Sequence, residues 1–303
     1  MNEGKDMYIN VVAVVVTYNR KELLHENIEC LLSQKPLVPS IMVVDNHSTD
    51  GTRESLQEYI EQGKILYFDT GANLGGAGGF SYGIKHAAEQ GYEYIWVMDD
   101  DCMPTENALA AFMSADEELK GNYGFLSSKV LWKDGSICKM NVQRETLTKN
   151  LKGFDKRIQT IVMASFVSLF IPTGIVKEMG LPIKEFFIWT DDWEYTRRIS
   201  RKYKCYAVAD SIVVHKSRTN VGANIATESV ERLDRFDYLY RNDVYLYRRE
   251  GIKGFCYEMM RLCAHSIRIL LKSKDNKRKR LSKIFRGTKK GFSFKPEIEY
   301  VEV

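Results

Sequence analysis

The first hundred residues predict an α/β fold, in which helices cover both faces of a parallel β-sheet. Strand-like and helix-like segments alternate, the strand-like segments are continuous apolar runs, and polar residues follow each run. Continuous runs of β-branched and aromatic residues indicate strands that are buried on both faces. In order, the segments are a strand at 9–17, a helix at 21–34, a strand at 41–44, a helix at 52–62, a strand at 64–68, a helix from about 79 to 89, and a strand at 94–98.

The alternation weakens beyond Pro104. We expect strands at 124–132 and 160–171, a helix at 191–202, a strand or strand pair at 206–214 that ends at His215, and mainly helix from 227 to 273. A boundary near residue 225 divides the chain into an α/β domain, residues 1–225, and a helical, basic C-terminal region, residues 226–303.

The composition, 44% apolar with a formal net charge of +4, is that of an ordinary soluble protein. Six cysteines without a CxxC pair, and an N-terminus without a signal-peptide pattern, predict free thiols in the cytoplasm. No segment has the roughly 18 apolar residues of a membrane-spanning helix. Positive charge gathers near the C-terminus, where residues 272–290 contain ten Lys or Arg and one acid.

Three consecutive acids, Asp99, Asp100 and Asp101, close the apolar run 94–98. Their charges repel one another unless a divalent cation, basic partners or water lies between them. Carboxylates suit Mg²⁺ or Mn²⁺, which in turn bind a diphosphate. The alternative is an acidic turn before a helix that starts near Pro104 and Glu106.

Glycines gather in the segment NLGGAGGF, residues 73–80. They allow a backbone to approach a ligand closely, and a helix N-terminus favours anions. The spacing matches neither the dinucleotide fingerprint nor a P-loop. Close packing of a helix on the sheet is the alternative explanation.

A second acid cluster, Asp191, Asp192 and Glu194, is flanked by Trp189 and Trp193. Apolar neighbours raise the pKa of a carboxylate and make it a better base near neutral pH. Acids in the first turn of a helix also complement its dipole without further function.

His215 ends an apolar run. A histidine in that position is commonly structural, and it becomes a candidate ligand only if the three aspartates hold a metal.

Together these clusters resemble the family 2 glycosyltransferases, which have the GT-A fold. The matching residues are VVVTYN (14–19), VVDNHSTDG (43–51), NLGGAGGF (73–80), DDD (99–101), TDDWE (190–194) and His215. The resemblance covers roughly residues 8–220. The glycine segment and the final acidic motif look most like those of bacterial galactofuranosyltransferases, and rhamnosyltransferases share much of the pattern.

The resemblance implies roles for individual residues. Asp192 would be the base that deprotonates the acceptor, with Asp191 orienting substrate and remaining a possible base. The other implied groups are nucleotide and donor binding by Thr17, Asn19, Asp45, Asn73, Gly76, Gly78 and Asp100, Mn²⁺ or Mg²⁺ binding by Asp99, Asp101 and His215, and acceptor binding by Trp189, Trp193 and Glu194.

The implied activity is inverting, metal-dependent transfer of a sugar onto a glycan or lipid-linked glycan in bacterial cell-surface polysaccharide synthesis, such as that of O-antigen. Galactofuranose from UDP-galactofuranose is the first expectation, and rhamnose from a dTDP donor is the alternative. Nucleotidyl transfer would need a basic, glycine-rich signature that residues 14–20 lack. A nucleotide-sugar-binding module without catalysis is the non-enzymatic alternative.

The C-terminal region permits peripheral attachment to the inner face of the plasma membrane. Residues 252–271 form an amphipathic pattern, and the basic tract follows it. A solvated tail or an oligomer-forming helix is the alternative. We do not expect nucleic acid as a partner, because the tract lacks interleaved aromatic residues.

Overall fold

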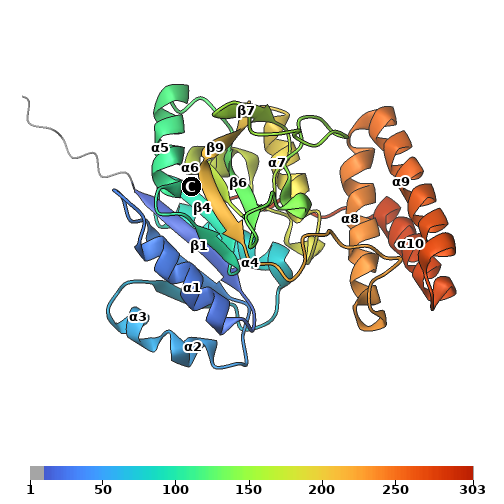
Figure 1. Ribbon diagram of the computed structural model, residues 1–303, viewed down its shortest axis with the longest axis horizontal. Coiled ribbons are helices and arrows are strands. Elements are labelled where there is room, and N and C mark those ends of the chain that lie inside the picture. The colour runs from blue at the N-terminus through green and yellow to red at the C-terminus, as the bar shows by residue number, and fades with distance from the viewer. Residues whose placement is uncertain (1–9, 303) are drawn as a thin grey trace, which may run out of the picture.

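A mixed nine-stranded sheet forms the centre of the computed structural model, which describes residues 10–302 (Figure 1). The strand order is β3-β2-β1-β4-β8-β6-β9-β5, and β7 pairs with β9. The bounds are β1 (Val11–Thr17), β2 (Ser40–Asp45), β3 (Leu66–Asp69), β4 (Tyr94–Asp99), β5 (Cys102–Pro104), β6 (Leu126–Trp132), β7 (Ile158–Ile161), β8 (Leu169–Pro172) and β9 (Cys205–His215). Strands β3, β2, β1 and β4 are parallel, as predicted, whereas β8 runs antiparallel to β4 and β6. Ile9, where the first strand was predicted to begin, lies outside the described residues.

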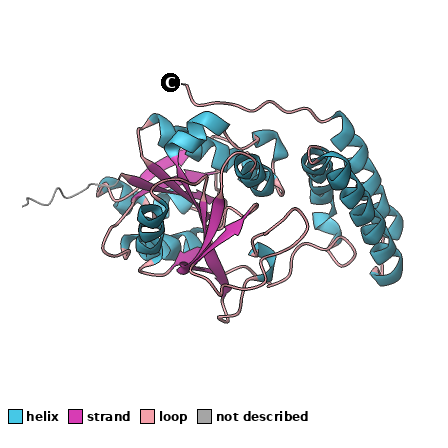
Figure 2. Cartoon of the chain, turned by 90° about the horizontal axis from the view of Figure 1, so that it is seen from above, coloured by secondary structure: helices cyan, strands magenta, loops and turns pink. Residues whose placement is uncertain are grey.

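Helices cover both faces of the sheet (Figure 2). Their bounds are α1 (Lys21–Leu32), α2 (Thr52–Ser55), α3 (Gln57–Glu61), α4 (Gly75–Glu89), α5 (Ala108–Leu119), α6 (Thr173–Met179), α7 (Asp191–Ser200), α8 (Phe236–Arg248), α9 (Gly251–Lys272) and α10 (Lys277–Ser293), with short 3₁₀ helices η1 (Lys139–Asn141), η2 (Lys184–Phe186) and η3 (Val230–Arg235).

Successive residues of β1 point to opposite faces, and every one is buried, which explains its continuous apolar sequence. Val12 and Val14 join a core formed with α4, α6 and α7. Ala13 and Val15 join a second core formed with α1 and α5. The predicted α/β architecture is therefore confirmed.

Two predicted elements differ from the structure. The helix at 52–62 is two short helices, because the backbone leaves helical geometry at Leu56, whose side chain is fully buried. The apolar run 160–171 contains two short strands, β7 and β8, joined by a buried connection rather than one long strand. The basic tract lies mostly in α10, which packs against α8 and keeps most of its basic side chains exposed.

The helices α8, α9 and α10 lie side by side at one end of the molecule (Figures 1 and 2). They share a small core of their own that includes Leu233, Tyr240 and Ile284. The chain then returns to the α/β body, where the Glu299 carbonyl accepts a hydrogen bond from Leu181 N–H at 2.7 Å. Among the described residues, no helix combines the length and apolar character needed to cross a membrane.

Candidate active site

The predicted polar clusters meet at the carboxyl ends of the parallel strands. Thr17 of β1 lies opposite Asp45 of β2, and Val16 lies opposite Asp99 of β4. In α/β sheets this edge is where ligands bind. The antiparallel pair β5 and β9 places His215 opposite Cys102, next to the three aspartates.

Asp100 is held by the protein itself. Thr17 Oγ1 donates to its Oδ2 at 2.8 Å, and the guanidinium of Arg20 reaches Oδ1 at 3.2 Å. The same guanidinium lies 2.8 Å from Asp101 Oδ2. Burial raises the pKa of Asp100 to about 6, against the opposing charge of Arg20. Sequence reasoning allowed for a basic partner but did not identify Arg20, although it directly follows the motif at 14–19.

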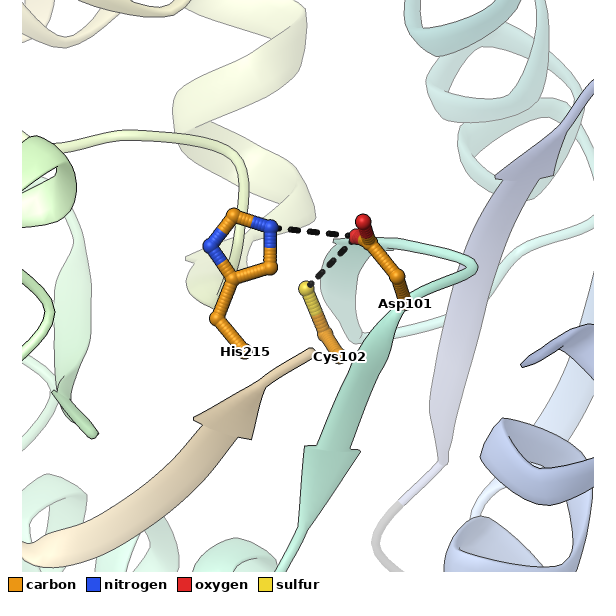
Figure 3. Close-up of side chains that lie close together, drawn as sticks. All are labelled: Asp101, Cys102 and His215. Carbon is orange, nitrogen blue, oxygen red and sulfur yellow. Dashed lines mark hydrogen bonds and ion pairs between the residues drawn. The ribbon is translucent and has the colours of Figure 1, made fainter. Parts of the chain in front are cut away.

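Asp101 and His215 form a buried pair (Figure 3). His215 Nε2 lies 3.1 Å from Asp101 Oδ1, and its Nδ1 lies 2.8 Å from Asn141 Oδ1. Burial lowers the pKa of His215, but the hydrogen bonds to Asp101 and Cys138 and the negative charges of Asp101 and Asp99 together outweigh burial and raise it to about 10. Asn141 therefore orients the ring, a contact that no feature of the sequence indicated.

Asp101, Cys102 and His215 each place one ligand atom within 4.8 Å of the others. Burial raises the pKa of the Cys102 thiol well above its usual value, and a neutral thiol is a poor ligand for a hard cation. Cys102 therefore does not fit an Mn²⁺ or Mg²⁺ site. The Asp101 carboxylate does, and His215 would join it once a bound cation displaces the proton from Nε2.

Asp99 is partly exposed, and none of the hydrogen bonds found within residues 10–302 involves its carboxylate. Burial and the negative charge of Asp101 raise its pKa to about 7. An acid without a hydrogen-bond donor, beside Asp101 and His215, fits a divalent cation, which would supply the missing positive charge.

The glycine segment lies in the first turns of α4, which begins at Gly75 rather than near residue 79. Packing explains Gly75 and Gly79 of this segment, and also Gly83 beyond it. A Cβ on Gly75 would meet the carbonyl oxygen of Phe187 at 2.1 Å, and Cβ atoms on Gly79 and Gly83 would meet Val16 and Val14 at 2.6 and 2.4 Å. Gly76 has open space instead, so its backbone is accessible to a ligand at the α4 N-terminus.

The other residues predicted to bind the donor also shape loops at this edge. Asp45 accepts hydrogen bonds from the Ser48 backbone N–H at 2.9 Å and the Tyr67 hydroxyl at 2.6 Å. Asn19 Oδ1 accepts from Thr49 N–H at 2.7 Å, and Asn73 Oδ1 accepts from Gly75 N–H at 2.9 Å. Gly78 faces only the Leu74 side chain.

Asp191 and Asp192 open α7, which follows a strained turn. Phe187, Trp189 and Thr190 have φ angles of 63°, 65° and 69°. Left-handed backbone at such non-glycine residues costs on the order of 1–3 kcal/mol each and gathers at functional sites.

Burial raises the pKa of Asp191 to about 6, against the backbone N–H groups of Asp191 and Asp192. Burial and the charges of Asp191 and Asp99 raise the pKa of Asp192 well above its usual value. The charge of Asp99 thus reaches Asp192, so the two acid clusters lie within electrostatic range of each other. A carboxyl with a raised pKa is suited to accept a proton near neutral pH.

The side chains predicted to bind the acceptor near Asp191 and Asp192 are engaged by other residues of the protein. Glu194 is buried in an ion pair with Arg198 at 3.0 Å. Trp189 packs against Phe236, with ring centroids 5.1 Å apart. Arg144 covers one face of the Trp193 ring at 3.9 Å.

Comparison with known proteins agrees with this geometry. The family model described as "Glycosyl transferase family 2" matches residues 12–127. The galactofuranosyltransferase GlfT1 of Mycolicibacterium smegmatis is 25% identical over 257 residues, which cover 80% of this chain and 84% of the relative. GlfT1 of Mycobacterium tuberculosis is 29% identical over 201 residues, which cover 63% of this chain and 65% of the relative.

Solved structures of similar fold include GalNAc-T7 with UDP, GalNAc and Mn²⁺, at a TM-score of 0.60 and 16% identity over 80% of this chain and 50% of that one. TarS 1–349 of S. aureus with UDP-GlcNAc has a TM-score of 0.54 and 14% identity over 94% and 73% of the two chains. At these identities the structures show the fold alone, which is the GT-A fold. Residues 12–127 therefore form a glycosyl transferase family 2 domain, and the chain is related in sequence to the galactofuranosyltransferases GlfT1.

Proposed function

We propose that the protein is an inverting, metal-dependent glycosyltransferase that moves a sugar from a nucleotide donor to an acceptor hydroxyl. The observation that supports it is a pair of acid clusters close enough for the charge of Asp99 to raise the pKa of Asp192. Asp99, Asp101 and His215 lie at the ends of β4 and β9, and Asp191 and Asp192 begin α7.

Each cluster has one task in this reaction. A divalent cation held by Asp99, Asp101 and His215 would act as a Lewis acid on the diphosphate. Asp192 accepts the proton of the acceptor hydroxyl as its oxygen attacks the anomeric carbon from the face opposite the nucleotide. A single displacement inverts that carbon and needs no protein nucleophile.

We infer that the donor is UDP-galactofuranose, with dTDP-rhamnose as the alternative. The relationship to GlfT1 supports galactofuranose, and the TarS complex with UDP-GlcNAc shows that a related fold accommodates a uridine donor. The acceptor is a glycan or a lipid-linked glycan at the cell envelope.

Calorimetry with UDP, dTDP and GDP, each with and without Mn²⁺, tests the donor. We expect Mn²⁺-dependent binding of UDP and at least about tenfold weaker binding of dTDP, because donor-specific hydrogen bonds are worth about 1.4 kcal/mol or more. A preference for dTDP would support the same type of reaction but would favour rhamnose over galactofuranose as the transferred sugar. Binding of UDP without turnover of any sugar donor would favour the binding-module alternative.

We also propose that the helices after residue 225 attach the enzyme to an anionic membrane surface. The outward side of α9 carries Ile252, Met260, Ile267 and Leu271, whose side chains are 83%, 64%, 56% and 78% exposed. These residues recur at helical spacing over about 28 Å of the helix. Phe255 of α9 lies against Phe292 of α10, which extends the apolar side onto the second helix.

Exposed basic residues end α9 and recur along α10, among them Lys272, Lys277, Arg278, Lys289 and Lys290. Each contributes about 1 kcal/mol near an anionic leaflet. A second copy of the chain is a less suitable partner, because symmetric contact would bring the two basic borders together.

Vesicle sedimentation tests this attachment. The double variant Ile267→Glu, Leu271→Glu is expected to lose at least about tenfold in affinity for phosphatidylglycerol-containing vesicles, because it places charge where apolar side chains enter the interface. Val221→Glu is the matched control, since Val221 is equally exposed but lies before α8. Unchanged vesicle binding by the double variant, or a change in oligomeric mass alone, would contradict the proposal.

A further inference from the structure

The turn before α7 is anchored at every carbonyl from Phe186 to Trp189. The side-chain amide of Asn242 in α8 donates to the carbonyls of Phe186, Ile188 and Trp189 at 3.0, 3.2 and 2.9 Å. The carbonyl of Phe187 accepts from Ala77 N–H in α4 at 3.2 Å. The turn is therefore held between α4, which carries the glycine segment, and the C-terminal helix α8.

The next residue of α8 continues this anchoring. Thr190 Oγ1 donates to Asp243 Oδ1 at 2.7 Å, and Arg261 of α9 donates to Asp243 Oδ2 at 2.9 Å. Asn242 and Asp243 are both almost completely buried. A buried chain of contacts thus runs from α9 through α8 to the residue that precedes Asp191.

We propose that Asn242 and Asp243 are positioning residues for glycosyl transfer, which hold the turn at 187–190 so that Asp191 and Asp192 face the donor. The inference rests on the proposed function and assigns part of the active site to the C-terminal helices.

The backbone of the turn supports this role over simple anchoring. A left-handed backbone at a non-glycine residue costs free energy, so a turn that only joined two elements would be more stable without it. Phe187, Trp189 and Thr190 nevertheless adopt this conformation. Such a conformation persists where surrounding contacts impose it, and here Asn242 and Asp243 provide most of the hydrogen bonds that reach residues 187–190 from elements distant in sequence. What the conformation determines is the direction in which the first turn of α7 begins. A displacement of about 1 Å at a reacting group can cost about 100-fold in rate.

Two substitutions test the contacts separately. Asn242→Leu removes the amide donors at similar volume, and Thr190→Val removes the hydroxyl while keeping the branched shape. We expect each to lower kcat at least 30-fold while the dissociation constant for UDP with Mn²⁺ stays within about threefold. Thr190→Ser, which restores the hydroxyl, is expected to recover most of the loss. Asp234→Asn is the control, because it breaks an exposed ion pair with Lys283 in the same helical region but does not contact the turn.

Readouts other than turnover separate positioning from stability. The fluorescence of Trp189 and Trp193, which flank Asp191 and Asp192, is expected to shift in Asn242→Leu at temperatures where its circular dichroism is unchanged. The pH at which kcat falls on the acid side is also expected to move. Variants with a lower melting temperature but unchanged kcat and fluorescence would overturn the inference. Wild-type protein without sugar transfer would instead refute the proposed function.

Discussion

Asp192→Asn is expected to lower kcat for sugar transfer by about 10²–10⁴-fold while leaving UDP affinity within about twofold. Asparagine keeps the size of the side chain but cannot accept the acceptor proton. Single-turnover assays with donor and acceptor, together with calorimetry of UDP and Mn²⁺, measure the two effects. Asp191→Asn is the matched variant, since Asp191 is the adjacent acid in the same turn of α7.

The pH profile gives an independent check on the base. A carboxyl acts as a base only after losing its proton, so activity should rise with pH through the pKa and then level off. Because burial and the charges of Asp191 and Asp99 raise the pKa of Asp192 well above its usual value, we expect kcat to fall on the acid side at a pH well above the ordinary pKa of an aspartate. The residual activity of Asp192→Asn should lack this acid limb. An active Asp192→Asn beside an inactive Asp191→Asn would assign the base to Asp191.

Asp101→Asn is expected to weaken Mn²⁺-dependent binding of UDP by at least about tenfold. The substitution removes a charge that faces His215 at 3.1 Å and Arg20 at 2.8 Å, and with it a proposed metal ligand. Calorimetric titration of UDP with Mn²⁺, and again with EDTA, measures the loss. The variant in Mn²⁺ should resemble the wild type in EDTA.

Asp210→Asn serves as its control. Asp210 is exposed on β9, the strand that ends at His215, so it tests a change of charge on the same element away from the site. Equal Mn²⁺ dependence in Asp101→Asn and the wild type would remove Asp101 from the metal site. Equal losses in both variants would point to the net charge of the protein instead.

The sequence by itself determined the α/β body and the place of its polar residues. Strands buried on both faces need continuous apolar runs, and β1 and β4 carry them in the sequence. The polar residues that follow, such as Thr17 and Asp99, must then meet at one edge because parallel strands end on the same side. The acid pair at the start of α7 could also be predicted from the sequence, because the two acids and the tryptophans that flank them are close neighbours along the chain.

Tertiary structure alone decided which side chains pair with the acidic residues and which side chain orients His215. Arg20, directly before α1, reaches Asp101, and Asn141 of η1 reaches His215, both from positions distant in sequence. Glu194 pairs with Arg198 instead of facing the site. The glycines of α4 serve mainly to let the helix approach β1 and Phe187 closely. This role depends on residues that fold against α4 from elsewhere in the chain. Asn242 lies in a helix whose sequence shows only an amphipathic pattern. Its role arises because folding places one amide opposite three carbonyls more than fifty residues away, a relation that no local pattern encodes.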